Sequence, residues 1–168
     1  MRGMTYRQKW DAAKADGIEI PERVLNEDIV GIYGFFAKKG DEKTCFYIGK
    51  ATNMRCRLFD GNNEGHIHYY FTKPWEKTSE PDNVRKKKKD YSVPINIHKY
   101  VNDGYKVFFQ ILEEVDYTDS SFSRAAHRLA FAELKAIVEY QKNEHCLEQL
   151  PEGVGSSERK YWEDHYKN

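Results

Sequence analysis

The chain has 168 residues, of which 39% are hydrophobic and 14% aromatic, and this composition argues for a folded domain and against a disordered protein. No apolar run approaches the roughly 18 residues that a membrane-spanning helix needs, and the N-terminus lacks the apolar stretch of a secretory signal peptide. The three cysteines show no Cys-x-x-Cys spacing, which argues against a zinc site and a disulfide framework. We therefore expect a cytoplasmic protein with reduced cysteines and no membrane partner.

The formal net charge is zero, but the charges are unevenly distributed along the chain. Residues 29–99 contain 14 Lys and Arg against 8 Asp and Glu, whereas residues 100–168 contain 8 against 13. Phosphate binding depends on the local potential rather than on the total charge. The basic middle of the chain is therefore compatible with nucleic-acid binding.

The N-terminal residues predict short helices. Apolar residues recur at helical spacing between residues 5 and 16, and Gly17 is a suitable helix stop. Pro21 begins a second helical turn. We expect residues 1–28 to form an N-terminal helical extension that packs on the main domain.

The next part of the chain predicts a β-hairpin followed by a helix. Residues Ile29–Phe36 read as a strand, and the Gly40-Asp41 pair indicates the turn that leads to a second strand, Cys45–Gly49. Thr52 is a candidate N-cap for the helix that follows.

Residues 60–95 have the least regular sequence and are expected to form a long, basic loop insertion. They contain three prolines and a run of five basic residues. A short helix at Pro94–Asn102 and a strand at Lys106–Val115 should follow this loop.

A long helix is predicted over Ser121–Lys142, with an acidic residue inside its apolar side. The expected apolar side comprises Ala126, Leu129, Ala130, Ile137 and Tyr140. Glu133 falls in the middle of that side. Either it is a surface acid that the assumed helical register misplaces, or it is buried as an ion-pair partner or a metal ligand, because an ionised carboxylate on an apolar face needs a compensating cation.

One ordered set of residues resembles the signature of the GIY-YIG nuclease family. Gly31-Ile32-Tyr33 is followed after thirteen residues by Tyr47-Ile48-Gly49-Lys50. Arg57, eight residues after Gly49, and Glu133 on the long helix match the family's arginine and acid. Each half of the signature alone is weak, whereas the ordered set at family-like spacing is specific.

The resemblance extends over roughly residues 29–140 and implies a fold. The segment Ile97–Glu114 is similar to the corresponding segment of phage intron homing nucleases in the same family. The implied fold is a small α/β domain, with a three-stranded, mainly antiparallel sheet flanked by helices. The catalytic domain would then span residues 29–143, with an acidic C-terminal tail at 144–168.

The resemblance also implies a catalytic set and a reaction. Tyr33 would activate the attacking water, and Tyr47 would contribute by hydrogen bonding. Lys50 is positioned to favour the phenolate form of a neighbouring tyrosine, and Arg57 would clamp the phosphate. Glu133, followed by the family's isoleucine four residues on, would hold Mg²⁺, for which Mn²⁺ can substitute. The expected reaction is metal-dependent hydrolysis of a DNA phosphodiester.

The chain departs from the family pattern at Gly61, where many relatives have His or Tyr. Two histidines in the following loop, His66 and His68, are candidates for the missing role. The alternative is that both are solvated loop residues.

The expected DNA contacts lie outside the catalytic set. They are Arg55 and the basic run Arg85, Lys86, Lys87, Lys88 and Lys89, which could track a phosphate backbone or form only a solvated charge block.

The expected partner is double-stranded DNA, cut by a homodimer or higher homo-oligomer. A site-specific restriction-type enzyme is the favoured form. The alternatives are a stand-alone phage or mobile-element nuclease with loose specificity, a non-cleaving DNA-binding module, and a protein-interaction adaptor.

Overall fold

The structure is a computed structural model that describes residues 3–63, 65–72, 92–151 and 163–165. Among these residues, none of the helices has both the length and the apolar character needed to cross a membrane. The basic run from Arg85 to Lys89 lies outside the described residues, so its contact with DNA stays a prediction.

The centre of the molecule is a four-stranded mixed sheet in the order β1-β4-β2-β3. Strand β2 (Gly31–Lys39) is antiparallel to both β3 (Glu42–Ala51) and β4 (Lys106–Glu114). Strand β1 (Ile18–Glu19) pairs with β4 in parallel. The predicted α/β class is confirmed, but the predicted three-stranded sheet lacks β1, because two residues are too few to show a strand periodicity.

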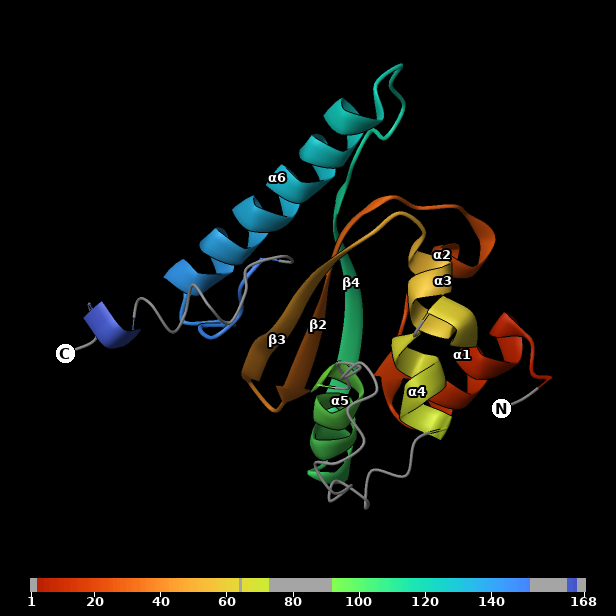
Figure 1. Cartoon of the computed structure of the whole chain (residues 1–168). Coiled ribbons are helices and arrows are strands. Elements are labelled where there is room, and N and C mark those ends of the chain that lie inside the picture. The colour runs from red at the N-terminus through yellow and green to blue at the C-terminus, as the bar shows by residue number, and fades with distance from the viewer. Residues whose placement is uncertain (1–2, 64, 73–91, 152–162, 166–168) are drawn as a thin grey trace.

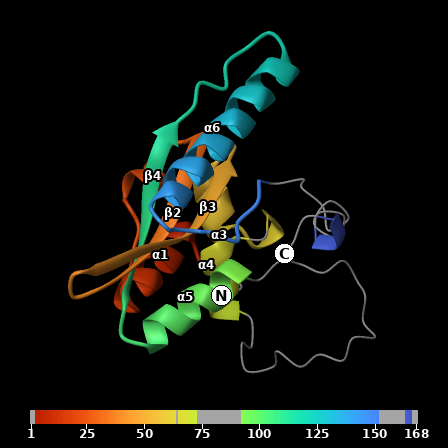
Figure 2. The same ribbon diagram turned by 90° about the vertical axis from the view of Figure 1, so that its left-hand side faces the viewer.

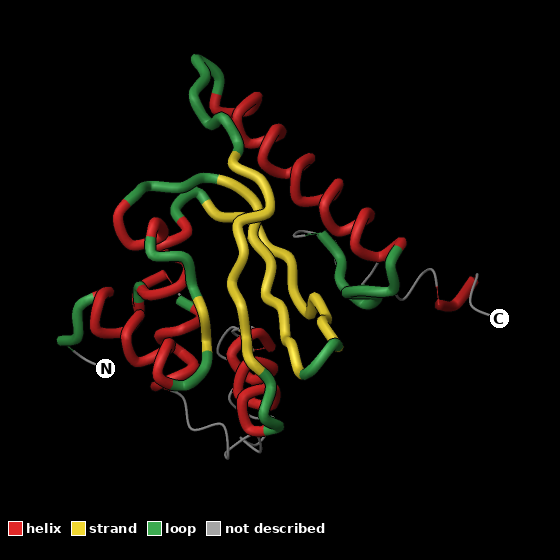
Figure 3. Tube along the Cα trace, turned by 180° about the vertical axis from the view of Figure 1, so that it is seen from behind, coloured by secondary structure: helices red, strands yellow, loops and turns green. Residues whose placement is uncertain are grey.

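In the described part of the chain, six α-helices flank the sheet in two layers. They are α1 (Tyr6–Ala15), α2 (Arg23–Asn26), α3 (Met54–Phe59), α4 (His66–Thr72), α5 (Ser92–Asn102) and α6 (Phe122–Lys142). Helix α6 covers one face alone, and the shorter helices lie on the opposite side (Figures 1 and 2). From behind, the strands run between these two groups of helices (Figure 3).

The core on the side of the short helices is built around aromatic rings. Tyr33 stacks on Phe109 with ring centroids 5.0 Å apart, and Phe35 meets Phe109 edge-on at 5.4 Å. Fully buried apolar side chains from α3 and α5, such as Leu58 and Ile97, close this core. Each such side chain contributes about 1.5–3 kcal/mol to folding.

The opposite face of the sheet packs against α6. Ile32 and Ile48 alternate with the core tyrosines along β2 and β3 and point to this second face. They meet Leu129, Ala132 and Ile137 of α6. Because neighbouring strand residues face opposite ways, the signature motif contributes to both cores.

The N-terminal residues, expected as an extension, complete the core. Thr5 is the N-cap of helix α1, and its side chain forms a capping box with Gln8. Ala13 and Val24 are fully buried in the core on the short-helix side, as is Ile18 of β1. Residues 5–26 are therefore an integral part of the packed structure rather than an appendage.

Part of the predicted 60–95 loop is helical. Helix α4 lies within that range, and its Ile67 and Tyr70 are buried against the core. The segment is rich in histidines and aromatics rather than strong helix formers, so packing outweighs local propensity. Two helix starts also differ from the prediction. Asn53, not Thr52, caps α3, and its side-chain oxygen accepts a hydrogen bond from the Cys56 amide at 3.1 Å. Helix α5 begins at Ser92 rather than at Pro94.

Residues 144–150, which we call the edge segment, cover the free edge of β3. The Ile48 amide donates to Gln149 Oε1 at 2.9 Å, and the Gln149 amide nitrogen donates to the Ile48 carbonyl. His145 Nδ1 accepts from the Cys45 amide at 3.2 Å. Part of the predicted acidic tail therefore caps an edge strand, whose unpaired backbone groups would otherwise need water or another chain.

Candidate active site

A pocket of about 1040 Å³ lies where the edge of β3 meets α3, α5, α6 and the edge segment. Tyr47 and Lys50 of β3 line it, together with Arg57 of α3 and Glu133 of α6. Four of the five residues predicted to be catalytic, which are far apart in the sequence, therefore share one pocket.

Tyr33 lies behind this pocket and not in its wall. Its side chain is fully buried, and its ring centroid is 6.1 Å from that of Tyr47. The fifth predicted catalytic residue therefore has no direct contact with the space that a substrate would enter. The expectation that Tyr33 itself activates the attacking water stays a prediction.

Gly49 makes room for the two tyrosines. It pairs with Tyr33 across the strands, and a Cβ at this position would lie 2.5 Å from the Tyr33 hydroxyl oxygen and 2.8 Å from Cε1 of Tyr47. Both distances are shorter than a real side chain tolerates. The glycine of the second half of the signature is thus required by the packing of the tyrosines.

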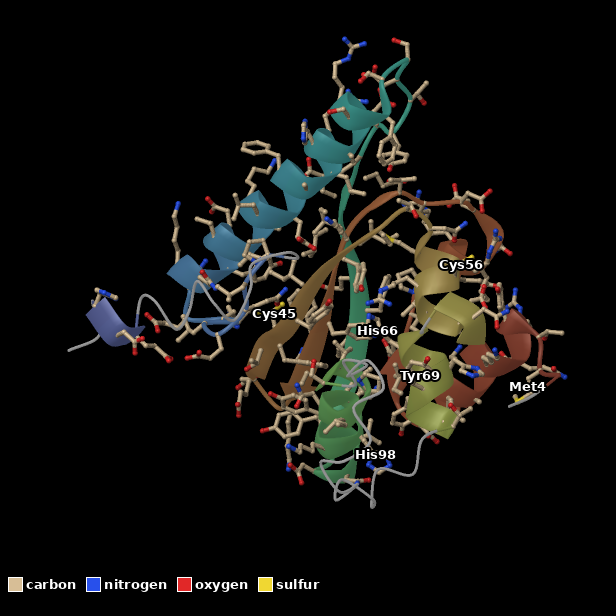
Figure 4. All side chains as sticks on the ribbon, in the orientation of Figure 1. Met4, Cys45, Cys56, His66, Tyr69 and His98 are labelled. Carbon is tan, nitrogen blue, oxygen red and sulfur yellow. The ribbon has the colours of Figure 1, made fainter. Side chains whose placement is uncertain are left out.

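His66 is the polar partner of Tyr33. The Tyr33 hydroxyl and His66 Nε2 form a hydrogen bond of 2.9 Å, in which the donor depends on the histidine tautomer. His66 lies on α4 between that helix and the sheet, and it is buried (Figure 4). Burial, helped by the nearby Arg57 charge, lowers the pKa of His66 well below its ordinary value. The imidazole is therefore neutral at pH 7.

The electrostatics of Tyr33 differ from the prediction. Burial raises the pKa of the Tyr33 phenol far above its ordinary value, and Tyr47 adds to that shift. The cation that opposes the shift is Arg57, which also hydrogen-bonds to both tyrosines, and not Lys50 as predicted. Desolvation outweighs the charge, so Tyr33 is a protonated phenol.

His68 occupies a different place on α4. Its Nδ1 is 3.1 Å from Lys9 Nζ, and a Cβ at Gly61 would lie 2.7 Å from its Nε2. The His68 ring therefore occupies the space that a side chain at position 61 would need. Of the two candidate histidines, it is His66 that joins the tyrosines and Arg57.

Glu133 is buried on the inner side of α6, as the helical periodicity predicted. It is only 6% exposed and lies between the buried Leu129 and Ile137, whereas Ala130, predicted on the same side, is exposed. Burying an ionised carboxylate costs several kcal/mol unless a cation compensates. Lys50 and Arg57 bring positive charge to the same pocket.

The pocket wall contains two carboxylates that could serve as metal ligands. Mg²⁺ prefers carboxylate oxygens, is commonly held by one or two of them, and takes its other ligands from water and substrate phosphate. Glu133 supplies one such carboxylate, and Glu148 of the edge segment lines the same pocket. The sequence interpretation gave Glu148 no role, because a tail residue carries no periodicity that would place it. In the described part of the chain, no three or more His, Cys, Asp or Glu residues gather as a metal cage.

Arg55 and Arg57 separate into different roles. Arg55 Nη2 contacts Asp28 Oδ1 at 2.5 Å, and Nη1 donates to the Leu25 carbonyl at 3.0 Å. Arg55 thus ties α3 to α2 and to the loop that follows it, and its contact with DNA stays a prediction. Arg57 lies in the pocket instead.

We expect Arg57→Ala to lower DNA cleavage by about 10²-fold or more, since one lost donor to a charged transition state has an effect of that size. Arg55→Ala should lower the melting temperature and leave the cleavage rate of the folded protein within a few-fold of wild type. Rates measured at saturating metal, with melting curves for both variants, check this. The reverse order of the two rates would assign the phosphate clamp to Arg55.

Comparisons with known protein families, with curated proteins and with solved structures gave no match for this chain. The interpretation of the site therefore depends on its own geometry and on the signature residues.

Proposed function

We propose that this protein is a metal-dependent DNA endonuclease of the GIY-YIG type. The observation that carries the proposal is the convergence of Tyr47, Lys50, Arg57 and Glu133 on one pocket. Tyr33 and His66 form a buried hydrogen-bonded pair directly behind it. A protein that only bound DNA would not need a buried carboxylate, two cations and paired tyrosines in one place.

The cations suit the binding of a phosphodiester. Arg57 offers planar, bidentate donors to phosphate oxygens, and Lys50 adds a point charge from the neighbouring strand. Both would offset the charge that grows on the phosphoryl group as water attacks. Their fixed positions on α3 and β3 reduce the reorganisation needed during the reaction.

Glu133 would hold the metal, with Glu148 in reach of the same pocket as a further oxygen donor. When bound, Mg²⁺ supplies charge stabilisation for the leaving 3′-oxygen. The expected products carry a 5′-phosphate and a 3′-hydroxyl.

The buried residues provide a route for the proton released by the attacking water. Tyr47 lines the pocket and hydrogen-bonds to Tyr33, which in turn hydrogen-bonds to His66 Nε2. In the tautomer with its proton on Nδ1, His66 accepts from the Tyr33 hydroxyl. As water gives a proton to Tyr47, the Tyr47 proton moves to Tyr33 and the Tyr33 proton moves to His66 Nε2. A phosphate beside Arg57 would offset the smaller of the two causes of the low His66 pKa, the Arg57 charge, whereas burial, the larger cause, would remain.

Incubation of supercoiled plasmid with the purified chain tests the proposal. We expect conversion to nicked and linear forms with Mg²⁺ or Mn²⁺, and none with EDTA. A set of discrete ends on the sequenced products would indicate restriction-type specificity, and scattered ends would indicate loose specificity. Plasmid that stays supercoiled with either metal while the chain binds it would favour a non-cleaving module.

Each chain contributes one such site, so we propose that cutting both strands uses a homodimer or higher homo-oligomer.

A further inference from the structure

Two of the three cysteines face each other at the edge of β3. Cys45 Sγ and Cys146 Sγ are 3.7 Å apart, although the residues are separated by 101 positions in the sequence. Cys146 Sγ also donates to the Cys45 carbonyl at 3.2 Å. Both are free thiols. The pairing joins the edge segment to the strand that carries Tyr47 and Lys50.

The two thiols have different surroundings. Cys45 is buried, whereas Cys146 is only partly buried, so Cys146 is the more accessible residue of the two. The hydrogen bond with Cys45 lowers the pKa of Cys146, and the same contact together with burial raises the pKa of Cys45. Cys146 is therefore the better nucleophile, since the thiolate is the reactive form.

We propose that Cys45 and Cys146 form an oxidation-sensitive pair, which a peroxide converts to an intramolecular disulfide that fixes the edge segment to β3. Cys146 sulfur attacks one peroxide oxygen, the O–O bond breaks, and a sulfenic acid and water form. Cys45 sulfur then attacks the sulfenic sulfur, and a second water leaves as the S–S bond forms. Two thiols are oxidised and one hydrogen peroxide is reduced to two waters.

The disulfide would act on the wall of the pocket. The edge segment is held to β3 by the hydrogen bonds of His145 and Gln149, and its Glu148 and Gln149 line the pocket. A covalent link would make this wall permanent. This inference does not depend on the proposed nuclease activity.

The third cysteine provides an internal control. Cys56 lies on α3, away from Cys45 (Figure 4). The full chain treated with graded hydrogen peroxide, alkylated and digested should show its free thiols fall from three to one. The remaining thiol should be Cys56, and one cross-linked peptide should join Cys45 to Cys146.

The melting temperature should rise by about 5 °C or more, because a link across so long a loop constrains the unfolded chain. Dithiothreitol should reverse both changes.

Variants make the result specific. Cys56→Ala should behave as wild type, whereas Cys45→Ala and Cys146→Ala should lose the cross-linked peptide and the rise in melting temperature. Wild type and Cys56→Ala decide the matter even where a variant of the buried Cys45 fails to fold. The proposal is overturned if peroxide leaves Cys45 and Cys146 unlinked, oxidises them separately to sulfinic acids, or links either one to Cys56.

Discussion

Replacing Glu133 by glutamine should abolish metal-dependent cleavage, lowering the rate by at least about 10³-fold, while the protein still folds and binds DNA. The carboxylate is buried in the wall of the pocket that Lys50 and Arg57 also line, and glutamine keeps its shape but removes its charge. Charge stabilisation by a metal contributes several kcal/mol to the transition state, and each 1.36 kcal/mol is about tenfold in rate. Single-turnover cleavage of a labelled duplex at saturating protein measures the loss directly.

The matched control is Glu139→Gln on the same helix. Glu139 is exposed and paired with Lys142 at 3.1 Å on the outer side of α6. That variant should cleave at the wild-type rate. Cleavage by Glu133→Gln within a few-fold of wild type would remove Glu133 from the mechanism and leave it as a buried ion-pair residue.

Tyr33→Phe should lower cleavage by about 10²–10⁴-fold, the usual contribution of a proton-transfer group. Phenylalanine keeps the ring that stacks on Phe109, so the core should survive. The substitution removes only the hydroxyl that bonds to His66, which interrupts the route from Tyr47. The rate is measured at saturating metal and protein, so that weakened binding does not contribute.

Tyr117→Phe serves as the comparison, because Tyr117 packs at the margin of the core under α6 and lies outside the pocket. It should cleave at nearly the wild-type rate. A loss below about threefold for Tyr33→Phe would show that no proton passes through this hydroxyl during the rate-limiting step.

The sequence predicted the features that depend on local periodicity. The hairpin of β2 and β3 follows from alternating residues around Gly40, and α6 follows from its apolar spacing. Glu133 stood out because a carboxylate on an apolar face is costly, and the structure places it in the pocket. Arg57 was preferred to Arg55 because its spacing from Gly49 matches the family's arginine, and the structure places Arg57 in the pocket wall.

Features that depend on long-range packing could not be predicted. Strand β1 exists because Ile18 pairs with Val107 of β4. Helix α4 forms because Ile67 and its neighbours are buried, and not because its residues have a high helix propensity. The choice of His66 over His68 required knowing which face of α4 meets Tyr33. The edge segment and its cysteine pair join residues about a hundred positions apart, a relation that no local pattern reveals.

Cleavage in ¹⁸O-labelled water tests most directly whether the pocket hydrolyses a phosphodiester. A duplex of defined sequence, or the plasmid itself, is cut with Mg²⁺ in labelled water, and the ends are analysed by mass spectrometry. One ¹⁸O should appear in the 5′-phosphate of each cut and none in the 3′-hydroxyl, and the signal should vanish with Glu133→Gln. Label on a 3′-phosphate, unlabelled ends, or an intact duplex under these conditions would contradict metal-assisted attack by water with departure of the 3′-oxygen.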